Sequence, residues 1–413
     1  MKIAIVGAGI SGLTAAHLLH REHDVSVFEA NAYAGGHTNT VRVDTADATH
    51  EVDTGFIVFN DRTYPNFERM LSRLGVAWQP STMTFGVSDD AGDFEYSGAS
   101  VNGLFAKRAH LATPWFHRMV ADMVRFNRRA RDLLASDENP SLGHWLEGQR
   151  LSRPFIDRLI VPQASAVWSA DPRQMWTFPA RFLVEFFDNH GMLGLRNRPQ
   201  WRTVTGGSKR YVEALVAPWR GRLRLSTPVE AVHRHADHVT VTSRGGEPER
   251  FDEVILATHS DQALGMLDDA TEREHEILGA VPYQANEAVL HTDIRMLPRR
   301  RRAWASWNYH LCETPAGKPT VTYHMNRLQA LDAADEFCVT LNRTERIAPE
   351  KIIRTIPYAH PVYTVDGHAA QGRHAEISGR NRTHFCGAYW RWGFHEDGVV
   401  SAMRVVERVN GRA

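Results

Sequence analysis

Near the end of the chain, residue types that can do chemistry crowd into one short stretch. Tyr389, Trp390, Trp392 and Phe394 stand within six residues, and His395 follows directly. Aromatic rings offer flat apolar walls to a ligand, and an imidazole can take up or relay a proton near neutral pH. We interpret this stretch as one wall of a ligand pocket in which a proton is moved, with a packed aromatic core as the alternative.

Three histidines are candidates for the proton transfer, in the order His395, His291 and His190. His291 lies inside the apolar segment "EAVLHTD", and His190 lies in "DNHG" after an aromatic-rich run. A hydrogen-bonded structural role is the alternative for His190. Glu396 and Asp397 open a helical pattern, so we expect them to accept hydrogen bonds from free N–H groups at the helix start.

The elements that would position these residues begin at the other end of the chain. A short apolar run at 2–6, typical of a buried strand, leads into Gly7, Gly9 and Gly12 in G-x-G-x-x-G spacing, and an amphipathic helix follows. The first glycine permits a tight turn, the second a close approach of phosphate, and the third close packing of helix on strand. This pattern predicts a dinucleotide-binding turn.

A second strand, at 25–28, ends at Glu29, where a carboxylate accepts hydrogen bonds from ribose hydroxyls. A glycine pair, Gly35-Gly36, follows shortly, with His37 and Thr38 behind it. This extension resembles the flavin-containing amine oxidase superfamily, in which an acid and a short spacer precede Gly-Gly, Arg and Thr. His37 stands where that family usually has the arginine.

The resemblance continues in "EVDTGFIVFN" and in the carboxyl-terminal stretch. It implies non-covalent FAD, with the last helix pointing its N-terminus at the pyrimidine end of the flavin ring, where reduced flavin carries negative charge. It also implies that Trp390, Trp392 and Phe394 face the substrate. The cofactor residues expected on this basis are Gly7, Gly9, Ser11, Gly12, Glu29, Ala30, Gly36, His37, Thr38, Gly55, Phe56, Val229, Gly387, Ala388, Phe394, His395 and Gly398.

Further segments, among them "WRTVTGGSKRYV", "LATHSDQAL" and "GAYWRWGFHEDG", resemble a bacterial subgroup of this superfamily related to the flavoprotein region of plant cyclopropane fatty acid synthases and to furan-fatty-acid desaturases. That resemblance implies dehydrogenation of a lipid acyl chain by hydride transfer to flavin N5, and a lipid methyltransferase as a possible partner. "EAVLHTD" lacks the lysine usual in amine oxidases. An amine or amino-acid oxidase, and a non-catalytic flavoprotein partner of a methyltransferase, remain the alternatives.

The expected fold is α/β, with a Rossmann-like FAD-binding domain of the amine oxidase type and an α+β substrate domain that contains an antiparallel sheet. We assign residues 1–75, 201–275 and 356–413 to the FAD-binding domain. Residues 76–200 and 276–355 form the substrate domain. The patterns predict helices at 60–75 and 116–135, and four strands between 284 and 345.

Composition excludes several other classes of protein. The net charge is +0, so the protein has no overall positive field that would attract nucleic acid. The three cysteines form no C-x-x-C pair, so we expect no metal site. We expect no signal peptide and no spanning helix, hence a cytoplasmic protein, with peripheral contact at the inner membrane face as the alternative. Arg299 to Arg302, or the aromatic-rich segment 176–193, would then meet lipid. The sequence assigns no oligomeric state.

Overall fold

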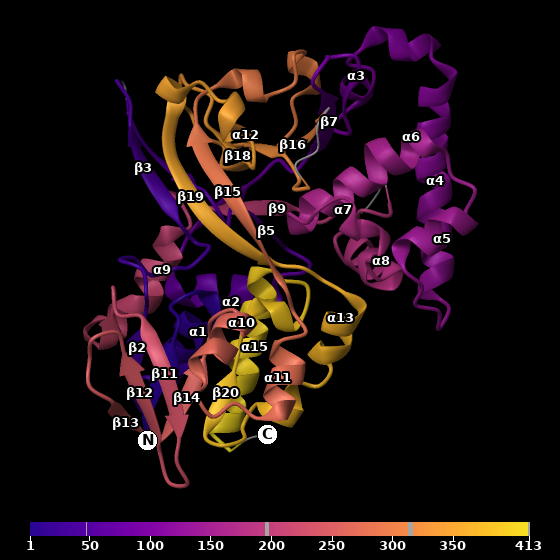
Figure 1. Ribbon diagram of the computed structural model, residues 1–413. Coiled ribbons are helices and arrows are strands. Elements are labelled where there is room, and N and C mark those ends of the chain that lie inside the picture. Colours follow the sequence, from indigo (N-terminus) through magenta and orange to yellow (C-terminus); the bar gives the residue numbers. More distant parts are fainter. Residues whose placement is uncertain (47, 195–197, 313–316, 412–413) are drawn as a thin grey trace.

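A five-stranded parallel sheet joins segments from the two ends and the middle of the chain. The computed structural model describes residues 1–46, 48–194, 198–312 and 317–411. The order of the sheet is β10 (Leu223–Arg224), β2 (Asp24–Phe28), β1 (Lys2–Val6), β14 (Glu253–Leu256) and β20 (Thr383–Phe385). Both chain ends thus belong to one layer, at the lower part of Figure 1.

Alternation along β1 decides what covers each face of this sheet. Ile3 and Ile5 point into a core shared with helices on one face, and Ala4 and Val6 point into a core on the other. The first face is covered by α1 (Ile10–Leu19), α2 (Pro65–Leu74), α9 (Lys209–Val216) and α15 (His395–Val409). The second face is covered by an antiparallel sheet of β11 (Val229–Arg234), β12 (Val239–Ser243) and β13 (Glu249–Phe251), with α10 (Ser260–Met266), α11 (Glu272–Leu278), α13 (Val365–Gln371) and α14 (His374–Ile377).

A larger sheet of seven strands stands above the first in Figure 1. Its order is β19 (Ile352–Pro361), β15 (Tyr283–His291), β18 (Cys338–Leu341), β17 (Val321–His324), β16 (Trp307–Leu311), β7 (Phe85–Asp89) and β8 (Glu95–Ser97). The pairs are antiparallel except β16 with β7, which run parallel. The four strands expected between 284 and 345 are confirmed as β15 to β18.

The domain boundary that we drew at residue 356 falls inside β19. That strand pairs along its whole length with β15, from Tyr283 opposite Pro361 to His291 opposite Ile352. Residues 356–361 therefore belong to the larger sheet rather than to the dinucleotide-binding layer. The backbone pairing of a distant strand decides this assignment, and no local pattern in 352–361 reports it.

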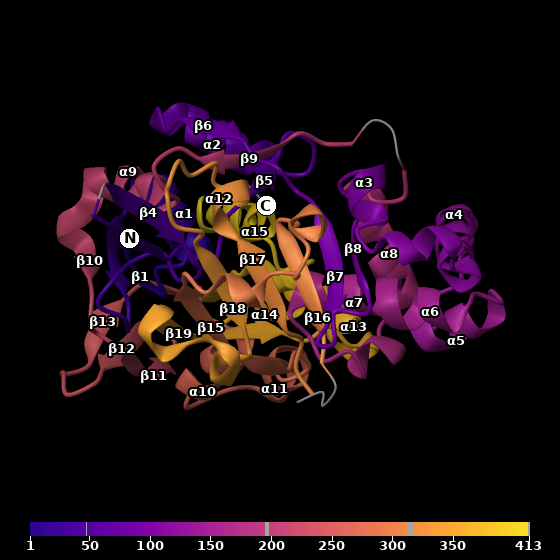
Figure 2. The same ribbon diagram turned by 90° about the horizontal axis from the view of Figure 1, so that it is seen from above.

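A lobe of helices packs on one side of the larger sheet, at the right of Figures 1 and 2. Its helices are α3 (Val101–Leu104), α4 (Pro114–Leu134), α5 (Leu142–Gly148), α6 (Arg153–Phe155), α7 (Val161–Trp168) and α8 (Ala180–Asn189). Aromatic side chains from α4, α7 and α8 share one core with Val87 and Tyr309 of the sheet. The helix predicted at 116–135 is confirmed as α4.

Shorter elements complete the fold. These are the pair β3 (Thr40–Asp44) and β4 (Thr49–Asp53), the sheet β5 (Phe59–Asn60), β9 (Trp201–Val204) and β6 (Trp78–Pro80), and the helix α12 (Met325–Leu328). The helix predicted at 60–75 begins only at Pro65, because Asn60 instead closes a turn by accepting hydrogen bonds from the N–H groups of Arg62 and Thr63. Within the described part of the chain, no helix has the length and apolar character that crossing a bilayer requires.

Candidate active site

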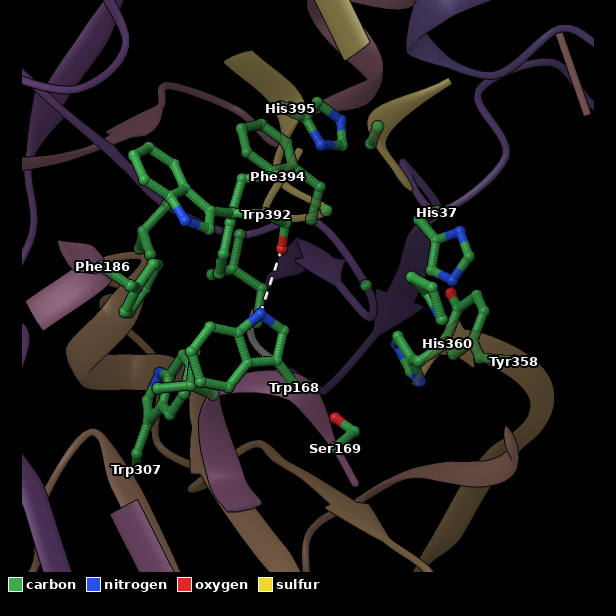
Figure 3. Close-up of a pocket in the computed structure, with 18 of the residues that line it drawn as sticks. His37, Trp168, Ser169, Phe186, Trp307, Tyr358, His360, Trp392, Phe394 and His395 are labelled. Carbon is green, nitrogen blue, oxygen red and sulfur yellow. Dashed lines mark hydrogen bonds between the residues drawn. The ribbon is translucent and has the colours of Figure 1, made fainter. Parts of the chain in front are cut away.

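A cavity of about 1680 Å³ runs from the glycine turn after β1 into the helical lobe. Sites for one drug-sized ligand usually measure about 300–1,000 Å³, so this cavity has space for a cofactor and a second molecule. Its walls come from both ends of the chain, from β19 and from helices α3, α4, α7 and α8. Figure 3 shows its central part, with His37 on one side and Phe186 and Trp168 on the other.

The glycine turn forms one end of the cavity. Gly7 has φ +101°, and a Cβ there would lie 2.8 Å from the carbonyl oxygen of Ala257. A Cβ on Gly9 would instead meet no atom within 4 Å, although Gly9 lines the cavity. The turn therefore leaves open space against the first backbone N–H groups of α1, which is the arrangement that a phosphate group needs.

Two of the expected cofactor glycines act by packing. A Cβ on Gly12 would lie 1.9 Å from the carbonyl oxygen of Gly7, so this glycine lets α1 lie close to the turn. A Cβ on Gly398 would lie 2.7 Å from Ile10 and 2.9 Å from Ser11, so it lets α15 lie close to α1. Neither glycine lines the cavity. Their expected contact with a cofactor is corrected to a role in bringing the two chain ends together.

Glu29 lines the cavity beyond the turn, next to Ala30 and near Val229. Its carboxylate accepts hydrogen bonds from the backbone N–H of Ala8 at 2.8 Å and from the backbone N–H of Asn31 at 2.9 Å. These bonds hold it in place at the end of β2, and a carboxylate can accept further hydrogen bonds. The position is the one expected for an acid that binds ribose hydroxyls.

His37 lies against the Gly35-Gly36 segment, and a Cβ on Gly36 would approach Gly9 to 3.2 Å. Its ring stacks on Tyr358 at 4.9 Å and lies 5.2 Å from the ring of His360. Burial lowers the pKa of His37 to about 4. Its Nε2 is buried and has no hydrogen-bond partner among the described residues. An orphaned donor or acceptor beside the phosphate turn indicates a missing polar ligand.

Helix α15 begins at His395, which also lines the cavity. The ring of His395 stacks on Phe56 at 3.5 Å, and its Nε2 is hydrogen-bonded to Thr38 Oγ1 at 2.9 Å and to Tyr211 Oη at 3.0 Å. Burial lowers the pKa of His395 well below its usual range, so the ring is neutral. Thr38 does not line the cavity and contributes by holding His395. Because Nε2 is already engaged, His395 is a poorer proton acceptor than its sequence position suggested.

The two acids at the start of α15 have structural partners, but only Asp397 binds at the start of its own helix as expected. Glu396 accepts hydrogen bonds from the backbone N–H groups of Asn66 and Phe67, at the start of α2. Asp397 accepts one from the backbone N–H of Phe394 at 3.0 Å. The backbone N–H groups of the first turn remain directed along the helix axis toward the cavity, with Gly387 and Ala388 beside them in its wall.

Aromatic side chains wall the half of the cavity that lies beyond Phe394. Phe394 stacks on Phe186 at 5.1 Å, and Trp168 donates a hydrogen bond from Nε1 to the carbonyl oxygen of Trp392 at 3.1 Å (Figure 3). His190 stacks on Phe186 at 3.9 Å and lies 5.7 Å from Phe394. Phe394, Trp392 and His190 thus come together as predicted, from the last loop and from the end of α8.

Trp390 does not join them. It is absent from the cavity wall and lies against His374 at 4.5 Å and Tyr389 at 4.9 Å, on the far face of the parallel sheet. The short turn at Ala388–Trp390 directs consecutive side chains in opposite directions, so two tryptophans only two positions apart serve different surfaces. The expectation that Trp390 contacts substrate is therefore corrected.

His291 also lies away from the cavity. It is fully buried in β15, hydrogen-bonded through Nε2 to Thr340 Oγ1 at 2.7 Å and through Nδ1 to the backbone N–H of Asp293 at 3.0 Å. With both ring nitrogens bonded inside the sheet, it is a structural histidine. Its selection as a base was wrong because His291 ends β15, whereas the residues of this strand that line the cavity, Tyr283 and Ala285, lie at its start.

Several cavity residues carried no signal in the sequence. Trp168, Trp307 and Tyr323 stand in ordinary helix and strand patterns, and Tyr363 lies in the loop after β19. Only packing of the lobe on the larger sheet brings them together. His259 and His360 line the wall near His37 in the same way. Among the described residues that line the cavity, Glu29 is the only carboxylate and there is no lysine. In the described part of the chain, no cluster of His, Cys, Asp or Glu has the makings of a metal site.

The comparisons with known proteins agree with this geometry. A family described as flavin containing amine oxidoreductase matches residues 10–290, more than half of the chain. The chain belongs to this family. Its α/β fold with an antiparallel substrate sheet, predicted from the sequence, is confirmed. AofH of Mycobacterium tuberculosis, assigned as a flavin-containing monoamine oxidase, is 27% identical over 262 residues, which are 60% of this chain and 55% of AofH.

The chain thus spans about half the length of the curated relatives that it matches. Two solved structures share the fold over nearly their whole length. Cyclohexylamine oxidase from Brevibacterium oxydans superposes with a TM-score of 0.69 at 15% identity, covering 99% of each chain. A CLA-producing fatty acid isomerase from P. acnes superposes with a TM-score of 0.67 at 16% identity, covering 98% of each chain.

FAD, the flavin cofactor of the family, fits the residues present. The open space at Gly9 and the orphaned Nε2 of His37 suit the phosphates, Glu29 suits the ribose, and the N-terminus of α15 suits the pyrimidine edge of the ring. When bound, the flavin supplies the capacity to accept two electrons from a substrate. The chain supplies position, exclusion of water by the aromatic wall, and stabilisation of negative charge by the α15 dipole.

Proposed function

We propose that the protein is an FAD-dependent oxidoreductase that dehydrogenates an acyl chain of a lipid. The observation that carries the proposal is the half of the cavity beyond Phe394, which α3, α4, α7 and α8 line with apolar side chains and which extends well past the aromatic wall. The one carboxylate of the wall, Glu29, lies at the dinucleotide end. An ammonium group on a substrate would therefore lose its hydration without gaining an anionic partner.

His190 is the best-placed proton acceptor for this reaction. Its Nδ1 lies 2.9 Å from the carbonyl oxygen of Phe186, and because a carbonyl only accepts, Nδ1 must carry the proton in the neutral ring. Its Nε2 then carries the lone pair, and its one partner is the Thr63 hydroxyl in a long hydrogen bond of 3.4 Å, whereas Nε2 of His395 has two shorter ones. Burial lowers the pKa of His190 to about 4, so the ring is neutral at pH 7.

The bonds that change are two C–H bonds on adjacent carbons of the acyl chain. His190 takes a proton from one carbon, a bound flavin would supply the acceptor for the hydride from the other, and a C=C bond forms between the two carbons, so that the substrate is oxidised by two electrons. A C–H bond next to an existing double bond or branch is weaker than one in a saturated chain. We therefore infer an unsaturated or branched acyl chain as the substrate.

The test is anaerobic mixing of the FAD-loaded protein with phospholipids that carry unsaturated or methyl-branched chains. We expect loss of the flavin absorbance near 450 nm and an acyl product lighter by two hydrogens, measured by mass. His190→Gln should slow flavin reduction by about 100-fold, the usual contribution of a positioned base, while exposed His144→Gln in the same lobe should leave the rate unchanged. No bleaching with any lipid, or equal rates for the two variants, would contradict the proposal.

An amine or amino-acid oxidase is the second candidate, favoured by the family match and by the likeness to AofH. The same experiment separates the two. Bleaching by amines or amino acids with peroxide release in air, and none with lipids, would select this candidate. The lipid methyltransferase partner expected from the sequence stays a prediction, to be tested by co-purification of the two proteins.

A further inference from the structure

The apolar half of the cavity reaches the molecular surface between α3 and α4. Val101 on α3 and Val124 on α4 both line the cavity, yet 75% of the Val101 side chain and 62% of the Val124 side chain are exposed. Leu104 and Val120, one turn away on the same two helices, line it from a partly buried position. Side chains that both line a cavity and face solvent mark its mouth.

Two further exposed apolar residues lie between Val101 and Val124 in the sequence. Leu111 is 55% exposed and Trp115 is 38% exposed, on the segment that links α3 to α4 and on the first turn of α4. Four large exposed hydrophobic side chains therefore fall within residues 101–124. Single exposed apolar residues are ordinary, but a cluster around an opening marks a binding surface.

The segment that carries this mouth is rich in positive charge. Residues 99–131 contain seven Lys and Arg and one acid, Asp122, in a chain whose net charge is +0. Asp122 is a fully buried residue of α4 that Arg118 and Arg125 bind. Outside the segment, Asp93 pairs with Lys107 and Asp132 with Arg129. The basic residues of the segment are Lys107, Arg108, Arg118, Arg125, Arg128, Arg129 and Arg131. A surface that presents both apolar and basic side chains complements a bilayer, whose anionic headgroups cover an apolar interior.

We propose that a docking face, formed by Val101, Val124 and Arg128 one turn after Val124 on α4, seats on an anionic lipid bilayer and admits one acyl chain into the cavity. The proposal rests on the proposed function, since it supplies the route by which a lipid chain reaches the aromatic wall. Figures 1 and 2 place α3 and α4 at the outer edge of the molecule, away from the parallel sheet, where a flat surface can meet them.

The two regions expected from the sequence to contact lipid, Arg299 to Arg302 and the segment 176–193, have other partners in the structure. Arg299 donates to the carbonyl oxygen of Asp90, Arg300 pairs with Glu95 at 2.9 Å, and Arg301 stacks over Trp304. In the segment 176–193, the large side chains of α8 are buried in the core of the lobe. Neither region carries large exposed apolar side chains, as the docking face does.

The test is flotation of the FAD-loaded protein with vesicles of phosphatidylcholine alone or mixed equally with phosphatidylglycerol. We expect binding only to the mixed vesicles, weakened by salt. Arg128→Glu should weaken binding by about tenfold or more, since each cation near an anionic surface contributes roughly fivefold and the reversal removes one and adds a repulsive charge. Val124→Asp should weaken it to a similar degree. Exposed Arg404→Glu on α15 and Val365→Asp on α13 are the matched controls and should bind like the parent protein.

Each result decides one point. Equal binding by all variants, or no binding of the parent protein to anionic vesicles, overturns the docking face. A dimer of the parent protein that Val124→Asp converts to a monomer, seen by sedimentation, would show that a second copy covers the face and would also overturn it. Flavin reduction by detergent-dispersed lipid requires no vesicle, so its loss or survival reports on the proposed function separately. Retained flavin absorbance verifies that each variant is folded.

Discussion

At the scale of single residues, the glycines of the first turn have separable roles. A side chain at Gly9 would enter the open space at the dinucleotide end, whereas a side chain at Gly12 would meet the backbone of Gly7 at 1.9 Å. The backbone of Gly9 has φ −76°, which any residue adopts. The same chemical change should therefore act on cofactor binding at one position and on folding at the other.

We expect Gly9→Val to leave the FAD-free protein folded but to abolish the yellow colour of the purified protein. Gly12→Val should lower the thermal midpoint of the FAD-free protein itself, because the backbone contact must break. Absorbance at 450 nm per mole of protein and thermal unfolding of the FAD-free form measure the two effects. A yellow Gly9→Val protein would refute the phosphate turn.

At the scale of elements, the two chain ends are joined by helix α15. Its first turn caps α2 through Glu396, and its contact with α1 depends on Gly398. The carboxylate of Glu396 satisfies two backbone N–H groups that the start of α2 leaves without partners inside the helix. Glu396 therefore fastens the carboxyl-terminal helix to an element more than three hundred residues earlier.

Glu396→Ala should lower the free energy of unfolding by about 1–3 kcal/mol, the usual cost of leaving buried groups without their hydrogen-bond partner. Glu407→Ala, at an exposed position of the same helix, should change it little. Urea unfolding of the FAD-free protein measures both. A Glu396→Ala protein as stable as the Glu407→Ala protein would contradict the capping role.

At the scale of the whole molecule, burial of many histidines makes stability depend on pH. Burial lowers the pKa of six histidines to about 4 or about 3; they are His37, His190, His259, His291, His310 and His360. Below the ordinary pKa of 6.5, the unfolded chain binds protons that these folded sites do not. Stability is therefore present above about pH 6.5 and is lost as the pH falls toward 4.

Two buried carboxyls oppose this trend. Burial raises the pKa of Asp53 and of Asp397 to about 7, so the folded state binds their protons first as the pH falls. Six histidines outweigh two carboxyls, and each uncompensated site contributes up to about 1.4 kcal/mol per pH unit. The urea midpoint of the FAD-free protein should fall steeply between pH 6.5 and pH 5. A midpoint that is flat over this range would contradict the assignment of neutral buried histidines.

The sequence by itself determined local features, namely a strand, a glycine turn, a helix and an acid in fixed order. These features follow from the spacing of neighbouring residues, and they predict the end of the cavity that suits a dinucleotide. Tertiary structure alone decided which histidine and which tryptophan face the cavity. His291 and Trp390 were misplaced and His190 was promoted because the part of a strand or loop that reaches the cavity depends on distant packing partners. The mouth between α3 and α4 likewise exists only once the helical lobe has packed on the larger sheet, since no single segment of the chain encloses it.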